Sequence, residues 1–142
     1  MERCYTGPQE EKPVMDWIPQ RYPMLYVDTI VRISEEFVCT RRAVTEGDGI
    51  SVSGTYLLEN MAQSAAVLCG YRSRHRESTA VYLGNIDHAQ VLRCPKAGDC
   101  IETEVCLEIA IAGMAKVRCK SFVITGENGR EPIGDGVFVL AG

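Results

Sequence analysis

No stretch of apolar residues in this chain approaches the roughly 18 positions that a membrane-spanning helix needs, so we expect no transmembrane segment. The first residues, MERCYTGPQEEKPV, are polar and lack the apolar core of a secretory signal. The seven cysteines include no Cys-x-x-Cys pair. Neither a metal site nor a disulfide framework is therefore expected, and the thiols are predicted to be reduced in the cytoplasm.

Positive charge and histidine are also scarce. With 15 Lys and Arg against 19 Asp and Glu, the net charge of −4 gives no general signal for nucleic-acid binding. Only two histidines are present, His75 and His88, so few side chains could act as a base near neutral pH. No cofactor is expected. The 142 residues, of which 46% are hydrophobic, predict one compact domain over 1–142, with 1–12 as a flexible terminus.

The segment 54–70 is the most informative part of the chain, because it is apolar almost throughout and yet contains Glu59. A helix that is apolar on every side should be wrapped by the rest of the fold. A carboxylate there must be paired, hydrogen-bonded or protonated, since an isolated buried charge is costly. Desolvation raises a carboxyl pKa toward the range of a general acid. The alternative is that Glu59 satisfies a buried backbone group or an arginine and does no chemistry.

Local patterns predict the remaining elements. The central helix is predicted over 54–69, starting near Ser53 and ending at Gly70 as its C′ residue. The Asn128-Gly129 dipeptide predicts a hairpin turn. Alternating or β-branched runs predict strands over 24–33, 37–44, 79–84 (with an extension to 92 left open), 100–111, 114–125 and 132–140. The sum is an α+β domain with a meandering antiparallel sheet and one long buried helix.

Charge alternation predicts the register of two of these strands. The odd positions of 101–111 are apolar apart from Thr103, and the acidic residues occupy the other face. The next strand carries basic residues on its own outer face. The acidic face of the first strand and the basic face of the second lie on the same side of the sheet if the numbers of two opposing residues add up to an even value. This predicts an odd-length loop, Ala112-Gly113-Met114, with Glu108 opposite Arg118.

Several motifs resemble, in order, those of the 3-hydroxyacyl-acyl-carrier-protein dehydratases. Ile18-Pro-Gln-Arg-Tyr-Pro-Met-Leu-Tyr-Val-Asp28 is similar to their opening motif, and Leu58-Glu-Asn-Met-Ala-Gln63 to their helix motif. Gly84-Asn-Ile-Asp87 and Pro95-Lys-Ala-Gly-Asp99 resemble two later stretches. The helix is most similar to that of the divergent dehydratase-like proteins of aryl polyene and pigment polyketide clusters. The resemblance implies a hot-dog fold, in which an antiparallel sheet wraps around one long central helix and the protomer pairs with a second one.

In that family, a helix acid and a histidine fourteen positions before it form the catalytic pair. The resemblance places the acid at Glu59 and the histidine position at Thr45, so the base is missing. A threonine hydroxyl cannot remove the α-proton of a 3-hydroxyacyl thioester, a step to which imidazole is suited. The second family histidine corresponds to Gln20. Glu46 and Asp48 are the nearest acidic replacements for the base.

Three further residues are predicted to bind substrate. Gly54 matches the glycine whose N–H receives the thioester carbonyl in this family, and N–H groups at a helix start stabilise negative charge. Gln63 follows Glu59 by one helical turn and can hydrogen-bond its carboxylate. Tyr56 is also assigned to substrate, although an apolar helix position is more often part of the core. The arginine-rich stretch 72–76 is a candidate docking site for an acidic carrier protein, with a solvated loop as the alternative.

The resemblance implies a substrate, a partner and a function. The substrate is an acyl-carrier-protein-bound 3-hydroxyacyl thioester, and the assembly is a homodimer or a heterodimer with a related dehydratase. The expected protein is dehydratase-like and acts in fatty-acid or polyene-type synthesis, with reduced or absent activity alone because Thr45 replaces the histidine. Two alternatives remain open: a non-catalytic partner subunit of an active dehydratase, and a hot-dog acyl thioesterase in which Glu59 activates water.

Overall fold

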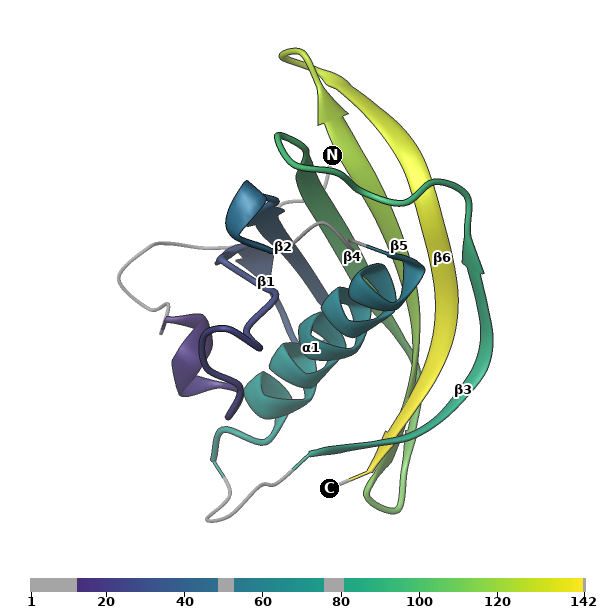
Figure 1. Cartoon of the computed structure of the whole chain (residues 1–142). Helices are drawn as coiled ribbons and strands as arrows, with labels where there is room; N and C mark the ends of the chain where they lie inside the picture. The colour runs from purple at the N-terminus through teal and green to yellow at the C-terminus, as the bar shows by residue number, and fades with distance from the viewer. Residues whose placement is uncertain (1–12, 49–52, 76–80, 142) are drawn as a thin grey trace.

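The computed structural model describes residues 13–48, 53–75 and 81–141. Its elements are η2 (Val14–Asp16), β1 (Thr29–Ile33), β2 (Phe37–Ala43), η3 (Glu46–Asp48), α1 (Gly54–Arg72), β3 (Tyr82–Val91), β4 (Cys100–Ile111), β5 (Met114–Thr125) and β6 (Gly129–Ala141). The strands form one antiparallel sheet in the order β1-β2-β4-β5-β6-β3, which curves around α1 (Figure 1). The predicted α+β architecture, a sheet wrapped around one long helix, is confirmed. No helix in the described part is both long and apolar enough to cross a membrane.

The helix α1 is buried on most of its circumference but not on all of it. Its fully buried side chains include Leu57, Met61 and Leu68, which pack against the inner face of the sheet. Four positions on one side are only partly buried. We call these the half-exposed strip of α1, and they are Leu58, Glu59, Ala62 and Ala66. The prediction that the rest of the fold covers this helix on every side is therefore wrong for the strip.

The two ends of α1 are fixed by local contacts. At the start, Ser53 is the N-cap and its hydroxyl oxygen accepts the N–H of Thr55 at 3.2 Å. At the other end, the prediction that Gly70 terminates the helix is wrong, because α1 continues to Arg72. Gly70 instead allows the N-terminal segment to approach closely. A Cβ at this position would lie 3.0 Å from the carbonyl oxygen of Trp17.

The hairpin between β4 and β5 corrects the predicted register. Its turn is the two-residue pair Ala112-Gly113, with φ angles of 53° and 79°, and Met114 already belongs to β5. Cys106, and not Glu108, lies opposite Arg118. A β-bulge at Glu108 shifts the pairing by one residue, so the acidic and basic faces still coincide despite the even-length loop. Arg118 donates to Glu108 at 2.8 Å across this bulge.

Two other predicted boundaries differ from the structure. Residues 24–28 are not a strand, because β1 begins only at Thr29. The turn between β5 and β6 spans 126–128, and its left-handed residue is Gly126, with a φ of 68°, so the Asn128-Gly129 dipeptide lies at the end of the turn and does not form its centre. The predicted flexible terminus, 1–12, lies outside the described residues.

A buried polar cluster joins α1 to the sheet and to the segment before β1. The side-chain oxygen of Asn60 accepts the hydroxyl of Thr103 at 2.6 Å, and Thr103 is also hydrogen-bonded to Ser121 at 2.7 Å. The Asn60 amide donates to the carbonyl of Tyr26 at 2.7 Å. All three side chains, those of Asn60, Thr103 and Ser121, are completely buried. Sliding or rotating α1 would leave these groups without partners, so the cluster fixes the position of the helix.

We expect Asn60→Ala to lower the free energy of unfolding by about 1–3 kcal/mol, because the Thr103 hydroxyl and the Tyr26 carbonyl lose a buried partner. Urea unfolding followed by circular dichroism measures this change. Asn128→Ala, in the exposed β5–β6 turn, is the matched control and should change stability by less than about 0.5 kcal/mol. Equal effects of the two substitutions would contradict the assigned role of Asn60.

Candidate active site

Glu59 lies in the half-exposed strip of α1, and Gln63 holds its carboxylate. The Gln63 amide nitrogen donates to Glu59 Oε2 at 2.7 Å and to the Met24 carbonyl at 2.8 Å. The Gln63 amide oxygen accepts the N–H of Tyr26 at 2.8 Å. Gln63 is only 1% exposed, so its amide is fixed on three sides and presents a defined N–H to Glu59. The predicted contact between Gln63 and Glu59 is present, whereas Glu59 is less buried than expected.

The start of α1 lies close to β3. A Cβ at Gly54 would lie 3.3 Å from a methyl group of Val91, so close packing already explains a glycine there. The first turn of a helix also directs N–H groups outward, and these favour a developing negative charge. Gly54 and Glu59 are five residues apart, about 7.5 Å along the helix axis. An acid and a set of N–H donors thus lie in the same half of α1. That Gly54 binds the substrate stays a prediction.

Thr45, at the position of the missing histidine, is tied to Asp48. The N–H and the hydroxyl of Thr45 donate to Asp48 Oδ2 at 2.8 and 3.3 Å, and Arg42 binds Oδ1. Burial alone would raise the pKa of Asp48, but the Thr45 N–H and the Arg42 guanidinium outweigh it and hold that pKa below its ordinary value. A carboxylate with a lowered pKa is a weak base, so Asp48 is a poor substitute for imidazole.

Arg42 connects this loop to α1 and to the end of the opening motif. Its guanidinium donates to the Tyr56 hydroxyl and to Asp28 Oδ1, both at 2.8 Å, as well as to Asp48. The Arg42 side chain is only 14% exposed. The ring of Tyr56 stacks on Tyr26 with centroids 4.5 Å apart. We call Asp28, Arg42, Asp48 and Tyr56 the Arg42 network. Tyr56 has a buried structural position within it, and its predicted contact with substrate remains untested.

The predicted basic docking loop is partly folded against the β1–β2 turn. Arg74 pairs with the Glu35 carboxylate at 2.6 Å and lies over the ring of Tyr71, 4.0 Å from its centroid. Arg72 donates to the Glu35 backbone carbonyl at 2.6 Å. Arg76 lies outside the described residues. The charge of Arg74 is thus already balanced by a carboxylate of the same chain.

A second charged cluster lies on the outer face of the sheet. Potential ligand atoms of Cys39, Glu102 and Glu104 lie within 4.8 Å of one another. Arg130 binds both carboxylates, at 3.0 Å for Glu102 and 2.8 Å for Glu104. Burial, followed by the neighbouring Glu102, raises the pKa of the Cys39 thiol to about 12. Ion pairing accounts for this cluster.

The strand β3 forms one edge of the sheet and has β6 as its neighbour. Nine of its ten residues are exposed. Its exposed side chains include Tyr82 at 67%, Leu83 at 46% and Ile86 at 37%. Long apolar edge strands are templates for pairing with another chain. Through Val91, β3 also borders the start of α1, so the candidate site adjoins this edge.

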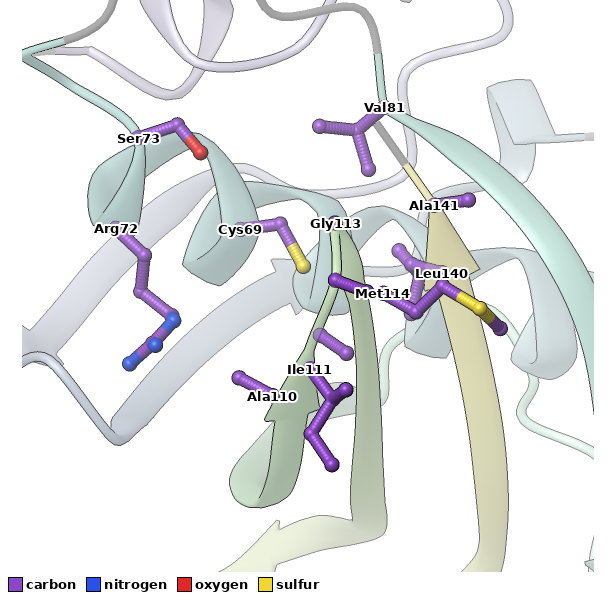
Figure 2. Close-up of a pocket in the computed structure, with 12 residues that line it drawn as sticks. Cys69, Arg72, Ser73, Val81, Ala110, Ile111, Gly113, Met114, Leu140 and Ala141 are labelled. Carbon is purple, nitrogen blue, oxygen red and sulfur yellow. The ribbon is translucent and has the colours of Figure 1, made fainter.

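A pocket lies at the other end of α1, between its last turns and the β4–β5 turn (Figure 2). Its volume is about 240 Å³. The first lining residue along α1 is Cys69, ten positions after Glu59 and about 15 Å further along the axis. This pocket is therefore separate from Glu59 and from the residues predicted to bind substrate.

We expect Asp48→Asn to lower the free energy of unfolding at neutral pH by about 1.5–3 kcal/mol, because charged hydrogen bonds in the Arg42 network are lost. The folded-state pKa of Asp48 lies below the reference value of 3.8, so its stabilisation is complete above that pH. It declines as the pH falls through the lowered pKa. The difference between wild type and variant should therefore shrink in acid, as measured by urea unfolding at several pH values. The exposed neighbour Glu46, changed to Gln, is the control, and an identical pH profile would contradict this role.

Comparison with sequences identifies similar proteins. A family model described as ApeP-like, ApeP dehydratase, matches residues 12–125. The 3-hydroxyacyl-[acyl-carrier-protein] dehydratase FabZ of Lactobacillus helveticus is 30% identical over 120 residues, which cover 78% of this chain and 80% of the relative. FabZ of Pseudothermotoga lettingae is 32% identical over 109 residues, covering 70% and 76%.

Comparison with solved structures identifies the fold. A chain of the dehydratase heterocomplex ApeI:P from Xenorhabdus doucetiae aligns with a TM-score of 0.71 and 17% identity, over 93% of this chain and 91% of that chain. A mutant acyl-CoA hydrolase from Staphylococcus aureus aligns with a TM-score of 0.62 and 18% identity, over 75% and 66%. At these identities the similarity shows a shared hot-dog fold.

Proposed function

The chain belongs to the ApeP-like dehydratase family, and we propose that it is one subunit of a hot-dog dehydratase dimer whose partner supplies the catalytic histidine. The observation that carries this proposal is an asymmetry in the site. Glu59 is held by Gln63 on a partly exposed surface, as an acid serving a shared site requires. Thr45 is bound to Asp48, which is itself bound to Arg42, and neither residue offers a comparable base.

Two exposed surfaces of this chain favour pairing with a related subunit. One is the exposed edge strand β3, and the other is the half-exposed strip of α1, which carries Glu59. Pairing along β3 would satisfy its outward-facing backbone groups and cover Leu83 and Ile86. The similarly folded ApeI:P assembly is a dehydratase heterocomplex, which supports an unlike partner for this chain as well.

The proposed reaction is the dehydration of a 3-hydroxyacyl thioester carried by acyl carrier protein, in fatty-acid or polyene-type synthesis. The partner's base removes the α-proton, and N–H groups at the start of a helix such as α1 stabilise the charge that develops on the thioester carbonyl. The Glu59 carboxyl then protonates the departing 3-hydroxyl, which leaves as water while the α–β double bond forms. Gln63 keeps the carboxyl oriented for this transfer.

A thioesterase activity is the second candidate, because an acyl-CoA hydrolase shares the fold and Glu59 is accessible enough to activate water. The two reactions give different products, a free acid in one case and an enoyl thioester in the other. As for location, none of the six described cysteines belongs to a disulfide, which fits a reducing cytoplasm.

The decisive experiment is an assay on a 3-hydroxyacyl carrier-protein thioester, with the chain alone and together with a histidine-bearing dehydratase subunit. Alone, we expect a rate about 10²–10⁴-fold below that of the mixed complex, since this is the usual contribution of a general base. In the mixed complex, Glu59→Gln should abolish most of the turnover without preventing complex formation. Full activity of the isolated chain, or no loss with Glu59→Gln, would refute the shared site. Release of free acid would identify a thioesterase.

Pairing through β3 makes a separate prediction. Ile86→Lys should weaken the complex at least about 30-fold, or ~2 kcal/mol, because a charge replaces an apolar side chain at the contact. Sedimentation velocity over a concentration series measures this. Leu92→Lys is the matched control, since Leu92 is 55% exposed and lies just outside β3. If both substitutions leave association unchanged, β3 is not the interface.

A further inference from the structure

The pocket at the C-terminal end of α1 takes no part in the proposed reaction. We call it the Cys69 pocket. It lies between the last turns of α1, the β4–β5 turn and the end of β6, and Figure 2 shows the Cys69 thiol turned from the helix toward that turn. Its distance from Glu59 along α1 makes it a separate site.

Most of the side chains that line the Cys69 pocket are apolar, and Arg72 is the one charged residue among them. Four alanines contribute only methyl groups to its walls, which leaves the space open: Ala110, Ala112, Ala115 and Ala141. Leu140 adds an aliphatic surface. Burial raises the pKa of the Cys69 thiol to about 11, so this group is neutral at physiological pH. An alkyl chain would therefore contact aliphatic side chains and a neutral thiol, next to the Ser73 and backbone groups that also line the pocket.

The rim of the pocket carries one positive charge, that of Arg72. The Arg72 guanidinium donates to the Glu35 backbone carbonyl, whereas the neighbouring Arg74 pairs with the Glu35 carboxylate. Among the described residues, no ion pair of Arg72 with a carboxylate is present. A guanidinium has five N–H donors, so one contact leaves capacity for an anion. The full positive charge of Arg72 also exceeds the partial negative charge of the helix C-terminus, so the helix end does not cancel it.

We propose that the Cys69 pocket binds a single aliphatic chain with one anionic headgroup, the chain lying against Ala110 and Leu140 and the headgroup on Arg72. The volume supports a slender ligand, because about 240 Å³ lies below the roughly 300–1,000 Å³ of sites for drug-sized molecules. A carboxylate and a phosphate share the chemistry that a guanidinium recognises. This site goes beyond the proposed dehydration and does not depend on Glu59.

Calorimetric titration of the full-length chain with decanoate, below its micellar concentration, tests the proposal. Decyl phosphate, decanol and decyltrimethylammonium are the comparison ligands. We expect an anionic ligand to bind about 10- to 100-fold more tightly than decanol, which is the contribution of a charged hydrogen bond. The tighter of the two anions identifies the headgroup. Equal binding of decanoate and decanol, tighter binding of the ammonium, or no binding at all would overturn the proposal.

Four variants locate the site. Arg72→Gln should weaken decanoate binding about 10- to 100-fold, whereas the matched Arg74→Gln should not. Ala110→Phe fills the pocket from an exposed strand position and should abolish binding. Glu59→Gln should leave decanoate affinity unchanged. A loss with Glu59→Gln, or none with Arg72→Gln, would place the ligand elsewhere and refute the assignment.

Alkylation of Cys69 gives an independent measurement. Bound decanoate should slow the reaction of Cys69 with N-ethylmaleimide, as followed by peptide mass mapping. Cys94 and Cys106 are exposed and outside the pocket, so they are internal controls whose rates should not change. Equal rates at Cys69 with and without saturating decanoate would contradict occupancy of the pocket.

Discussion

The hydrogen bonds of Asn60 and Gln63 to the segment 24–26 are the contacts on which the site depends. Both side chains leave α1 one turn apart on its buried side, and both bind backbone groups of residues that form no strand. Without these bonds, buried N–H and C=O groups would lack partners at a cost of about 1–3 kcal/mol each. The same bonds orient Gln63 so that its remaining N–H reaches Glu59. The fold and the acid are thus stabilised by one set of interactions.

The parts of the fold that are predictable from sequence are those with a local cause. The strands 100–111 and 114–125 follow from alternation of residue types. Burial alternates along most of β5, whereas in β4 Glu102 is buried and both Ile109 and Ile111 are exposed. Which residues of the two strands face each other does not follow from the sequence, because a bulge at Glu108 shifts by one residue the pairing that begins at the turn. Residues 24–28 have strand-like composition, but their backbone groups bind Gln63 and Asn60, more than thirty residues away. A pattern of neighbouring residues contains no information about such partners.

The same distinction applies to the site. The contact between Glu59 and Gln63 is predictable because residues four apart share a helix face. The Arg42 network joins Asp28, Arg42, Asp48 and Tyr56, which come from four separate parts of the chain, and no spacing indicates it. The Cys69 pocket is lined by alanines on β4, β5 and β6. The sequence does not indicate this pocket, because small side chains contribute to it only by leaving space.

The Arg42 network also bears on the proposed lack of activity of the isolated chain, because a histidine at position 45 would lack the support of its neighbours. The N–H and hydroxyl of Thr45 both face Asp48, whose other oxygen belongs to Arg42. An imidazole at position 45 would compete for a carboxylate that is already committed to a guanidinium. Catalytic geometry requires support by neighbouring residues as well as the correct side chain. Here that support has been given to a structural ion pair. This is the reason why the proposed reaction takes its base from another subunit and uses Glu59, held by Gln63, as the acid of this one.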